Sequence, residues 1–187
     1  MPVRPSLVIA VLAVLYFAPG LLFFYVAEGL DRCPEPPCHR AVLVPPGEPG
    51  EPLVVTGTVY RSDGETPAAG VTLYAYHTDA EGLYSETNDN TNPRLKATVR
   101  TDADGRYELK TIKPAPYPGG GVPAHIHYRL SGEGLAEQRF ELHFKRDPYL
   151  SRPMKEHSER QGRFGSIRPL IRDGDGWRCV YDLRLRP

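Results

Sequence analysis

Residues 97–111 read Ala-Thr-Val-Arg-Thr-Asp-Ala-Asp-Gly-Arg-Tyr-Glu-Leu-Lys-Thr, and this stretch decides the fold class. Its centre, Asp102-Ala-Asp-Gly105, is rich in turn residues and separates two short segments of strand-like composition. Asp and Gly at such a point favour a tight turn between strands. The stretch therefore predicts a β-hairpin formed by residues 97–101 and 106–111.

Short strands are predicted on both sides of this hairpin. The chain has 20 Pro and 18 Gly in 187 residues, a density that favours short strands and many turns over long helices. The fold class predicted is all-β, a β-sandwich of short, mostly antiparallel strands. Residues 85–95 are expected to form a loop. Residues 145–176 are expected to form a long irregular excursion, either a solvated, mobile loop or a partial cover over a functional site. The other predicted strands are residues 53–60, 71–76, 125–130, 139–144 and 177–185.

The chain divides into three parts. Leu7–Ala27 has no charged residue and, at about 21 residues, is long enough to cross a bilayer as one hydrophobic helix. Residues 1–27 are therefore interpreted as a signal anchor, with a cleaved signal peptide as the alternative. Residues 28–52 are expected to be a Pro-rich linker without a packed element, and 53–187 the folded domain. An extracytoplasmic domain, tethered to a membrane or secreted, is the expected arrangement.

Charge and cysteine usage narrow the function classes. Lys+Arg and Asp+Glu both total 23, so the basic excess of a nucleic-acid binder is absent and no nucleic-acid partner is expected. The three cysteines are Cys33, Cys38 and Cys179. In an oxidising compartment they predict one disulfide and one remaining thiol, and the pairing stays open.

The sharpest local motif is Pro123-Ala-His-Ile-His127. Side chains on a strand alternate between its two faces, so the two histidines point the same way and form a potential chelating pair. A surface pair is the alternative for such a motif taken alone. Tyr117 lies just upstream, among prolines that restrict the backbone, and Tyr84 follows the Gly82 turn. Taken singly, either tyrosine reads as a half-buried aromatic residue.

Together these motifs have the order and spacing of a known family. They resemble the intradiol ring-cleavage dioxygenases, the catechol and protocatechuate dioxygenase family, over most of residues 53–187. The segments that carry the resemblance are Gly57-Thr-Val59, Thr78-Asp-Ala-Glu-Gly-Leu-Tyr84, Thr101-Asp-Ala-Asp-Gly-Arg-Tyr107, Lys110-Thr-Ile-Lys-Pro-Ala-Pro-Tyr-Pro118, Pro123-Ala-His-Ile-His127, Leu142-His-Phe144, Asp147-Pro148 and Cys179-Val-Tyr-Asp-Leu-Arg-Leu185.

The resemblance implies a non-haem iron(III) site and a reaction. Tyr84, Tyr117, His125 and His127 fall on the four positions of the family's iron ligands, and the two tyrosines are also the expected catalytic residues. Phenolate oxygen suits a hard, highly charged cation such as Fe(3+), and imidazole suits iron generally. The implied substrates are a small aromatic diol of the catechol type and O2, with cleavage between the two hydroxyl-bearing carbons. The particular diol and the oligomeric state stay open.

Two positions depart from the family pattern. Val122 stands where the family has an arginine that stabilises charge on the substrate ring, and Glu141 stands where it has a glutamine. Arg94, Arg100 or Arg129 could supply the cation from elsewhere. Two alternatives to the enzyme therefore stay open. One is a non-catalytic, ferric-binding relative. The other is a structural β-sandwich module similar to carboxypeptidase-regulatory-like and transthyretin-like repeats.

Overall fold

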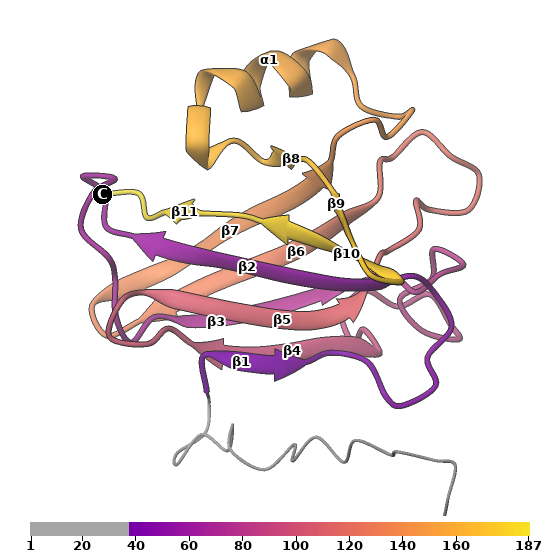
Figure 1. Ribbon diagram of the computed structural model, residues 1–187, viewed down its shortest axis with the longest axis horizontal. Helices are drawn as coiled ribbons and strands as arrows, with labels where there is room; N and C mark the ends of the chain where they lie inside the picture. Colours follow the sequence, from indigo (N-terminus) through magenta and orange to yellow (C-terminus); the bar gives the residue numbers. More distant parts are fainter. Residues whose placement is uncertain (1–37) are drawn as a thin grey trace, which may run out of the picture. The chain divides into compact units, whose positions relative to one another are not determined.

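The structure, a computed structural model, describes residues 38–187, which fold as two sheets packed face to face (Figure 1). The first sheet has the order β1 (Arg40–Val42), β5 (Arg106–Ile112), β2 (Pro52–Tyr60), β10 (Gly176–Val180) and β9 (Ile171–Asp173), and β11 (Leu183–Arg184) also pairs with β2. The second has the order β4 (Leu95–Arg100), β3 (Thr72–His77), β6 (His125–Gly132), β7 (Leu135–Phe144) and β8 (Ile167–Arg168).

The predicted all-β sandwich is confirmed. Within residues 38–187, five of the nine strand pairings are antiparallel, so the expected preference for antiparallel pairing holds narrowly. The parallel pairs arise because β1, β8, β10 and β11 join the sheets after long excursions of the chain rather than through hairpins.

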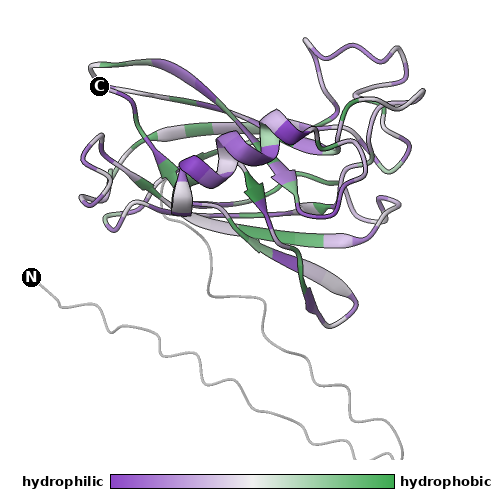
Figure 2. Ribbon diagram, turned by 90° about the horizontal axis from the view of Figure 1, so that it is seen from above, coloured by the Kyte–Doolittle hydropathy of each residue, from purple (hydrophilic) through white to green (hydrophobic). Residues whose placement is uncertain are grey.

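The core lies between the sheets, and strand periodicity fills it. On β6 the side chains of Ile126, Tyr128 and Leu130 are fully buried, while His125 and His127 alternate with them and face outward from the sandwich. The other strands contribute in the same way, and their apolar residues alternate with polar ones along the ribbons (Figure 2). One strand thus supplies both core residues and the predicted metal ligands.

The 97–111 stretch forms its turn but not a hairpin. Gly105 N–H donates to the Asp102 carbonyl (3.0 Å), and the Asp102 carboxylate accepts from the Arg106 N–H (2.7 Å), as the turn residues predicted. The flanking strands, however, enter different sheets, because β4 pairs with β3 over six residues and β5 pairs with β2 over seven. The hairpin prediction was therefore wrong: the turn is a corner that connects the two layers. Burial explains why the two strands enter different sheets: Val99 of one sheet and Leu109 of the other then pack in the same core.

Part of the expected linker is folded. Residues 40–42 form β1, which runs parallel to β5, and Leu43 is buried in the core. The Arg94 guanidinium donates two hydrogen bonds to the Glu48 carboxylate, forming a bidentate ion pair. The predicted linker over 28–52 and the domain start at Leu53 were therefore wrong for residues 40–52, where partners distant in the sequence order a Pro-rich segment. No helix within residues 38–187 is long and apolar enough to span a membrane, and the predicted span Leu7–Ala27 lies outside the described residues.

The 145–176 segment is more regular than predicted. It contains α1 (Arg152–Arg160), the 3-10 helix η1 (Gly162–Phe164), β8 and β9. Ser151 caps α1 by accepting from the Met154 N–H (3.4 Å). Only Ser158 of α1 is buried, and the helix is largely hydrophilic (Figure 2). The sequence of this helix has no apolar stripe, so the usual pattern that predicts a surface helix is missing.

Close packing explains why position 57, in the Gly-x-Val motif, is a glycine. A Cβ added at this position would lie 2.0 Å from the Tyr181 carbonyl oxygen, which also accepts a hydrogen bond from the Tyr107 hydroxyl (2.7 Å). The absence of a side chain lets the segment between β10 and β11 lie directly against β2. Gly57 therefore joins the last part of the sheet to its central strand.

We expect Gly57→Ala to lower the free energy of unfolding by about 2 kcal/mol or more, because backbone must move to relieve the clash. Urea denaturation followed by Trp177 fluorescence measures this. Gly132→Ala is the matched control, since a Cβ there meets only Leu135 at 3.9 Å. Equal midpoints for the two variants would contradict the packing role of Gly57.

The cysteines allow a second test. Cys38 is disulfide-bonded, Cys179 is a buried free thiol, and Cys33 lies outside the described residues. Burial raises the pKa of the Cys179 thiol to about 12, so the reactive thiolate is scarce at pH 8. We expect the native protein to resist a disulfide-exchange reagent and to release one thiol per chain when unfolded without reductant. Rapid labelling of the native protein would contradict this burial.

Candidate metal centre

The four predicted ligands converge on one point. Their donor atoms form a closed ring. Tyr84 Oη lies 2.6 Å from Tyr117 Oη and 2.8 Å from His127 Nε2. His125 Nε2 lies 2.9 Å from His127 Nε2 and 3.4 Å from Tyr117 Oη. Residues up to 43 positions apart in the sequence therefore present two phenol oxygens and two imidazole nitrogens to a single small space.

The second ring nitrogen of each histidine is held from behind. His125 Nδ1 lies 2.8 Å from the Pro123 carbonyl, which can only accept, so Nδ1 carries the proton and Nε2 presents a lone pair to the ring of donors. His127 Nδ1 lies 3.5 Å from the Glu141 carboxylate, the arrangement in which a carboxylate orients a metal-binding imidazole. Two nitrogen lone pairs that face each other at 2.9 Å repel, unless a cation lies between them.

The phenols come from two loops that are fixed to each other. The Asp79 carboxylate accepts from the N–H groups of Glu81 and Leu83 (3.0 Å each), and the Asp79 carbonyl accepts from the Ala115 N–H. Gly82 has φ +85°, and a Cβ there would lie 2.2 Å from the Pro116 carbonyl oxygen. The Gly82 turn, two residues before Tyr84, is thus in direct contact with the residue before Tyr117.

Burial favours the uncharged forms of the tyrosine and histidine side chains at this site. Burial raises the pKa of Tyr84 well above its ordinary value, and the adjacent Tyr117 hydroxyl raises it further. Burial also lowers the pKa of His127 to about 4, helped by the neighbouring His125. A bound cation would reverse the preference of the phenols, because metal ions depress the pKa of their ligands. Donor separations of 2.6–3.4 Å fit one ion about 2 Å from each atom. The donor set therefore suits a hard, highly charged metal.

Sequence reasoning did not single out two further aromatic contacts. The Tyr76 ring stacks on His127, with centroids 4.6 Å apart and planes at 19°, and His143 stacks on His125 at 5.6 Å. Strand register explains both contacts, since Tyr76 on β3 is opposite His127 on β6, and His143 on β7 is opposite His125 on β6. Sequence alone could have found them once the pairing of these strands was known.

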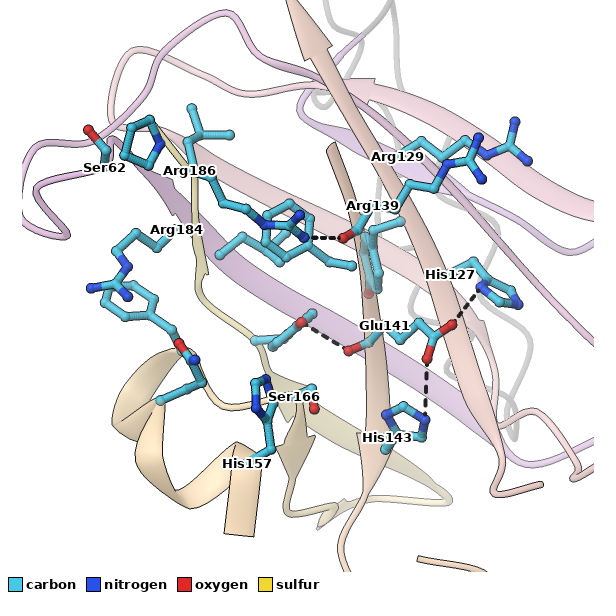
Figure 3. A pocket seen from close by; sticks show the side chains of 18 of the residues that line it. Ser62, His127, Arg129, Arg139, Glu141, His143, His157, Ser166, Arg184 and Arg186 are labelled. Atoms are coloured by element: carbon cyan, nitrogen blue, oxygen red, sulfur yellow. Dashed lines mark hydrogen bonds and ion pairs between the residues drawn. The ribbon is translucent and has the colours of Figure 1, made fainter. Parts of the chain in front are cut away.

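Glu141 lies behind the donor atoms rather than among them. His125, His127 and Glu141 bring ligand atoms within 4.8 Å of one another, which on its own suggests two histidines and a carboxylate around a metal. The carboxylate, however, lies on the Nδ1 side of His127 and 3.7 Å from His143 Nε2 (Figure 3). Glu141 is therefore placed to orient imidazoles, whereas the hydroxyls of Tyr84 and Tyr117 lie on the Nε2 side with the other donor atoms.

A cavity of about 810 Å³ adjoins this centre. Of the four donors only His127 lines it, beside Tyr76 and Glu141, and residues of α1, η1 and the segment after η1 line another part. Of the three arginines considered as substitutes at position 122, only Arg129 lines this cavity. Arg94 is bound by Glu48 and Asp79, and Arg100 donates to the Gly70 carbonyl. Val122 is 38% exposed and does not line the cavity.

Known proteins share this sequence pattern. The family described as Dioxygenase matches residues 38–187. Catechol 1,2-dioxygenase 1 from Acinetobacter lwoffii is 31% identical over 124 residues, which cover 56% of this chain and 40% of the relative. The protocatechuate 3,4-dioxygenase beta chain from Burkholderia cepacia is 35% identical over 118 residues, 56% of this chain and 50% of the relative. The matched regions thus span half or less of the length of these relatives.

Solved structures share the fold. The dioxygenase domain of a dioxygenase–carbohydrate-binding protein fusion from Streptomyces sp. SirexAA-E superposes with a TM-score of 0.63 at 28% identity, covering 85% of this chain and 94% of that one. The 3-chlorocatechol 1,2-dioxygenase from Rhodococcus opacus 1CP superposes with a TM-score of 0.61 at 25% identity, covering 77% and 63%.

Family, fold and motif order agree over the whole described domain. The match to the family begins at residue 38, where the described structure begins, and includes all four donor residues. The members of this family are non-haem iron dioxygenases that act on catechols with O2. This chain belongs to the intradiol ring-cleavage dioxygenase family.

Proposed function

We propose that this protein is an iron(III)-dependent dioxygenase that cleaves the ring of a catechol-like aromatic diol with O2, between the two hydroxyl-bearing carbons. The single observation that carries the proposal is the closed ring of four donor atoms from Tyr84, Tyr117, His125 and His127, with neighbouring atoms 2.6–3.4 Å apart. Two phenolates and two neutral imidazoles match the charge and hardness of Fe(3+).

Each residue has a defined task in this proposal. When bound, iron(III) supplies a Lewis acid that takes up the diol oxygens and makes the ring reactive towards O2. His125 and His127 keep their Nε2 lone pairs directed inward, because the Pro123 carbonyl and the Glu141 carboxylate hold their other nitrogens. Tyr84 stays in place, held through the Gly82 turn and by its 2.8 Å contact to His127.

Tyr117 is the phenol suited to take a proton from the incoming diol. Its 3.4 Å contact to His125 is the longest side of the donor ring. Next to it, Gly119 and Gly121 have positive φ, and a Cβ added at either would meet nothing within 4 Å, so this end of its loop is loosely packed. Release of Tyr117 Oη from the donor ring would free space for one diol oxygen and provide a base for its proton.

A non-catalytic ferric-binding relative is the second candidate. Val122 favours it, because the arginine of the family pattern is missing there and no cation replaces it at that position. The structural-module alternative loses its support, since such a module needs neither Tyr117 nor the two histidines, and all four donors converge.

We also propose that the domain works outside the cytoplasm, tethered to a membrane through residues 7–27 or secreted. The disulfide at Cys38 supports this, because such bonds persist in oxidising compartments. The uncharged run Leu7–Ala27 supports it independently.

The visible spectrum tests the main proposal. Phenolate-to-iron(III) charge transfer absorbs visible light, so we expect the iron-loaded protein to be coloured and the band to shift when catechol is added. Consumption of O2 together with the diol, measured with an oxygen electrode, would establish turnover. A coloured protein whose band shifts without oxygen uptake would favour the ferric-binding relative. A colourless iron-loaded protein would contradict both.

Tyr117→Phe tests the ligand assignment. Removal of one phenolate should weaken or shift the visible band and reduce turnover by at least about 100-fold, because a donor and a base are lost together. Tyr60→Phe is the matched control, since Tyr60 packs against Phe164 and is not one of the four donors. An unchanged spectrum in Tyr117→Phe would show that this phenol does not bind the metal.

A further inference from the structure

We infer that the diol carries an anionic substituent, which Arg129 and Arg139 bind at the rim of the cavity. This inference rests on the proposed function, because it assigns the far end of the substrate whose diol end lies at the four donors.

Strand register places the two arginines together. Arg129 on β6 is directly opposite Arg139 on β7, and the next pair on the same face is His127 opposite Glu141. Both arginine side chains extend on the same side of the strands as His127 (Figure 3). Like charges directly opposite each other destabilise a sheet. A pair of guanidinium groups kept at such a position suits a carboxylate, which each can bind with two parallel hydrogen bonds.

The spacing from the donors fits an aromatic ring. A step of two residues along a strand is about 7 Å, so the arginine pair begins one such step from His127. A benzene ring with a diol at one end and a carboxylate at the other spans a comparable length. The long arginine side chains leave room for a short linker between ring and carboxylate as well.

Aromatic rings support Arg129. Its guanidinium carbon lies 5.4 Å from the centroid of the Tyr76 ring and 5.8 Å from that of Tyr74. Tyr76 in turn stacks on His127. Cation–π contacts of this kind fix the cation without neutralising it. The stack therefore links Arg129 to the metal-binding imidazole and keeps its charge available.

The nearby carboxylates are engaged elsewhere or exposed. Glu137 accepts from Arg139 Nε (3.1 Å), but the two side chains are 47% and 75% exposed, so this pair is weak. Glu141 faces the imidazoles of His127 and His143. No ion pair within residues 38–187 joins Arg129 to a carboxylate.

The rest of the cavity has the same sign of charge. Arg184 and Arg186 also line it, so four arginines stand against Glu141 as the one acidic lining residue of the described chain. Arg186 donates to the Arg139 carbonyl (2.8 Å) and lies over the Phe140 ring, which fixes it beside the pair (Figure 3). A volume of about 810 Å³ exceeds the needs of an unsubstituted catechol. An extended, anionic diol fits this space better than a neutral or cationic one.

Titration of the visible band of the iron-loaded full chain tests the inference. The probes are 3,4-dihydroxybenzoate and 3,4-dihydroxycinnamate as anions, catechol as the neutral diol, and dopamine as the cationic one. We expect the anions to reach half-saturation at concentrations about tenfold lower than catechol, as two partly exposed charge pairs would give, and dopamine to bind weakest. The preference should weaken in high salt.

In the Arg129→Gln Arg139→Gln double variant, we expect the anionic diols and catechol to reach half-saturation at similar concentrations. Arg139→Gln alone should give an intermediate preference. Arg178→Gln, whose side chain pairs with Asp173 away from the cavity, is the matched control and should keep the full preference.

The outcomes separate this inference from the proposed function. A band that shifts equally with anionic, neutral and cationic diols would overturn the inference and leave the proposed function intact. So would an anion preference that survives in the double variant. A protein without a visible band, or a band that no diol shifts, would overturn the proposed function and the inference with it.

Discussion

The register of β6 between β3 and β7 is the constraint on which both the core and the site depend. Ile126, Tyr128 and Leu130 are buried between the sheets, and the residues between them face outward as potential ligands. A slip by one residue would bring the imidazoles into the core and expose the apolar side chains. The burial of three large side chains therefore fixes the direction of His125 and His127. The free energy of core packing therefore also positions the two imidazoles, which would otherwise have to be ordered one by one.

The two halves of the donor set are ordered by different means. The imidazoles are held by strand pairing and by groups behind them, whereas the phenols lie on loops. Those loops are fixed to each other, since the Asp79 turn bonds to Ala115 and Gly82 lies against Pro116. Beyond Pro118 the loop carrying Tyr117 is loosely packed, because a Cβ added at Gly119 or Gly121 would meet nothing within 4 Å. This asymmetry suits a site in which one phenol must stay and the other must yield.

Much of the site was predictable from sequence, and less of the architecture. The four donors could be predicted because their motifs have the order and spacing of a known family, whereas the two tyrosines taken singly carried no such signal. The turn at Asp102–Gly105 was predictable from its local residue types, but not the sheets its strands would join, since that depends on burial far along the chain. Residues 40–43 gave no signal of their own and are ordered by β5 and the core. The pairing of Arg129 with Arg139 is a matter of register, which no single segment specifies.

The position of β2 has a consequence for how the chain folds. This strand lies between β5 and β10, and the Thr58 N–H donates to the carboxylate of Asp182, which lies 124 residues further along the sequence. The central strand of the first sheet is therefore incompletely paired until the final segment arrives. Contacts of such long range slow folding and delay it until synthesis of the domain is complete. A polypeptide that stays unfolded for this interval is competent for translocation through a narrow pore, which the proposed location outside the cytoplasm would require.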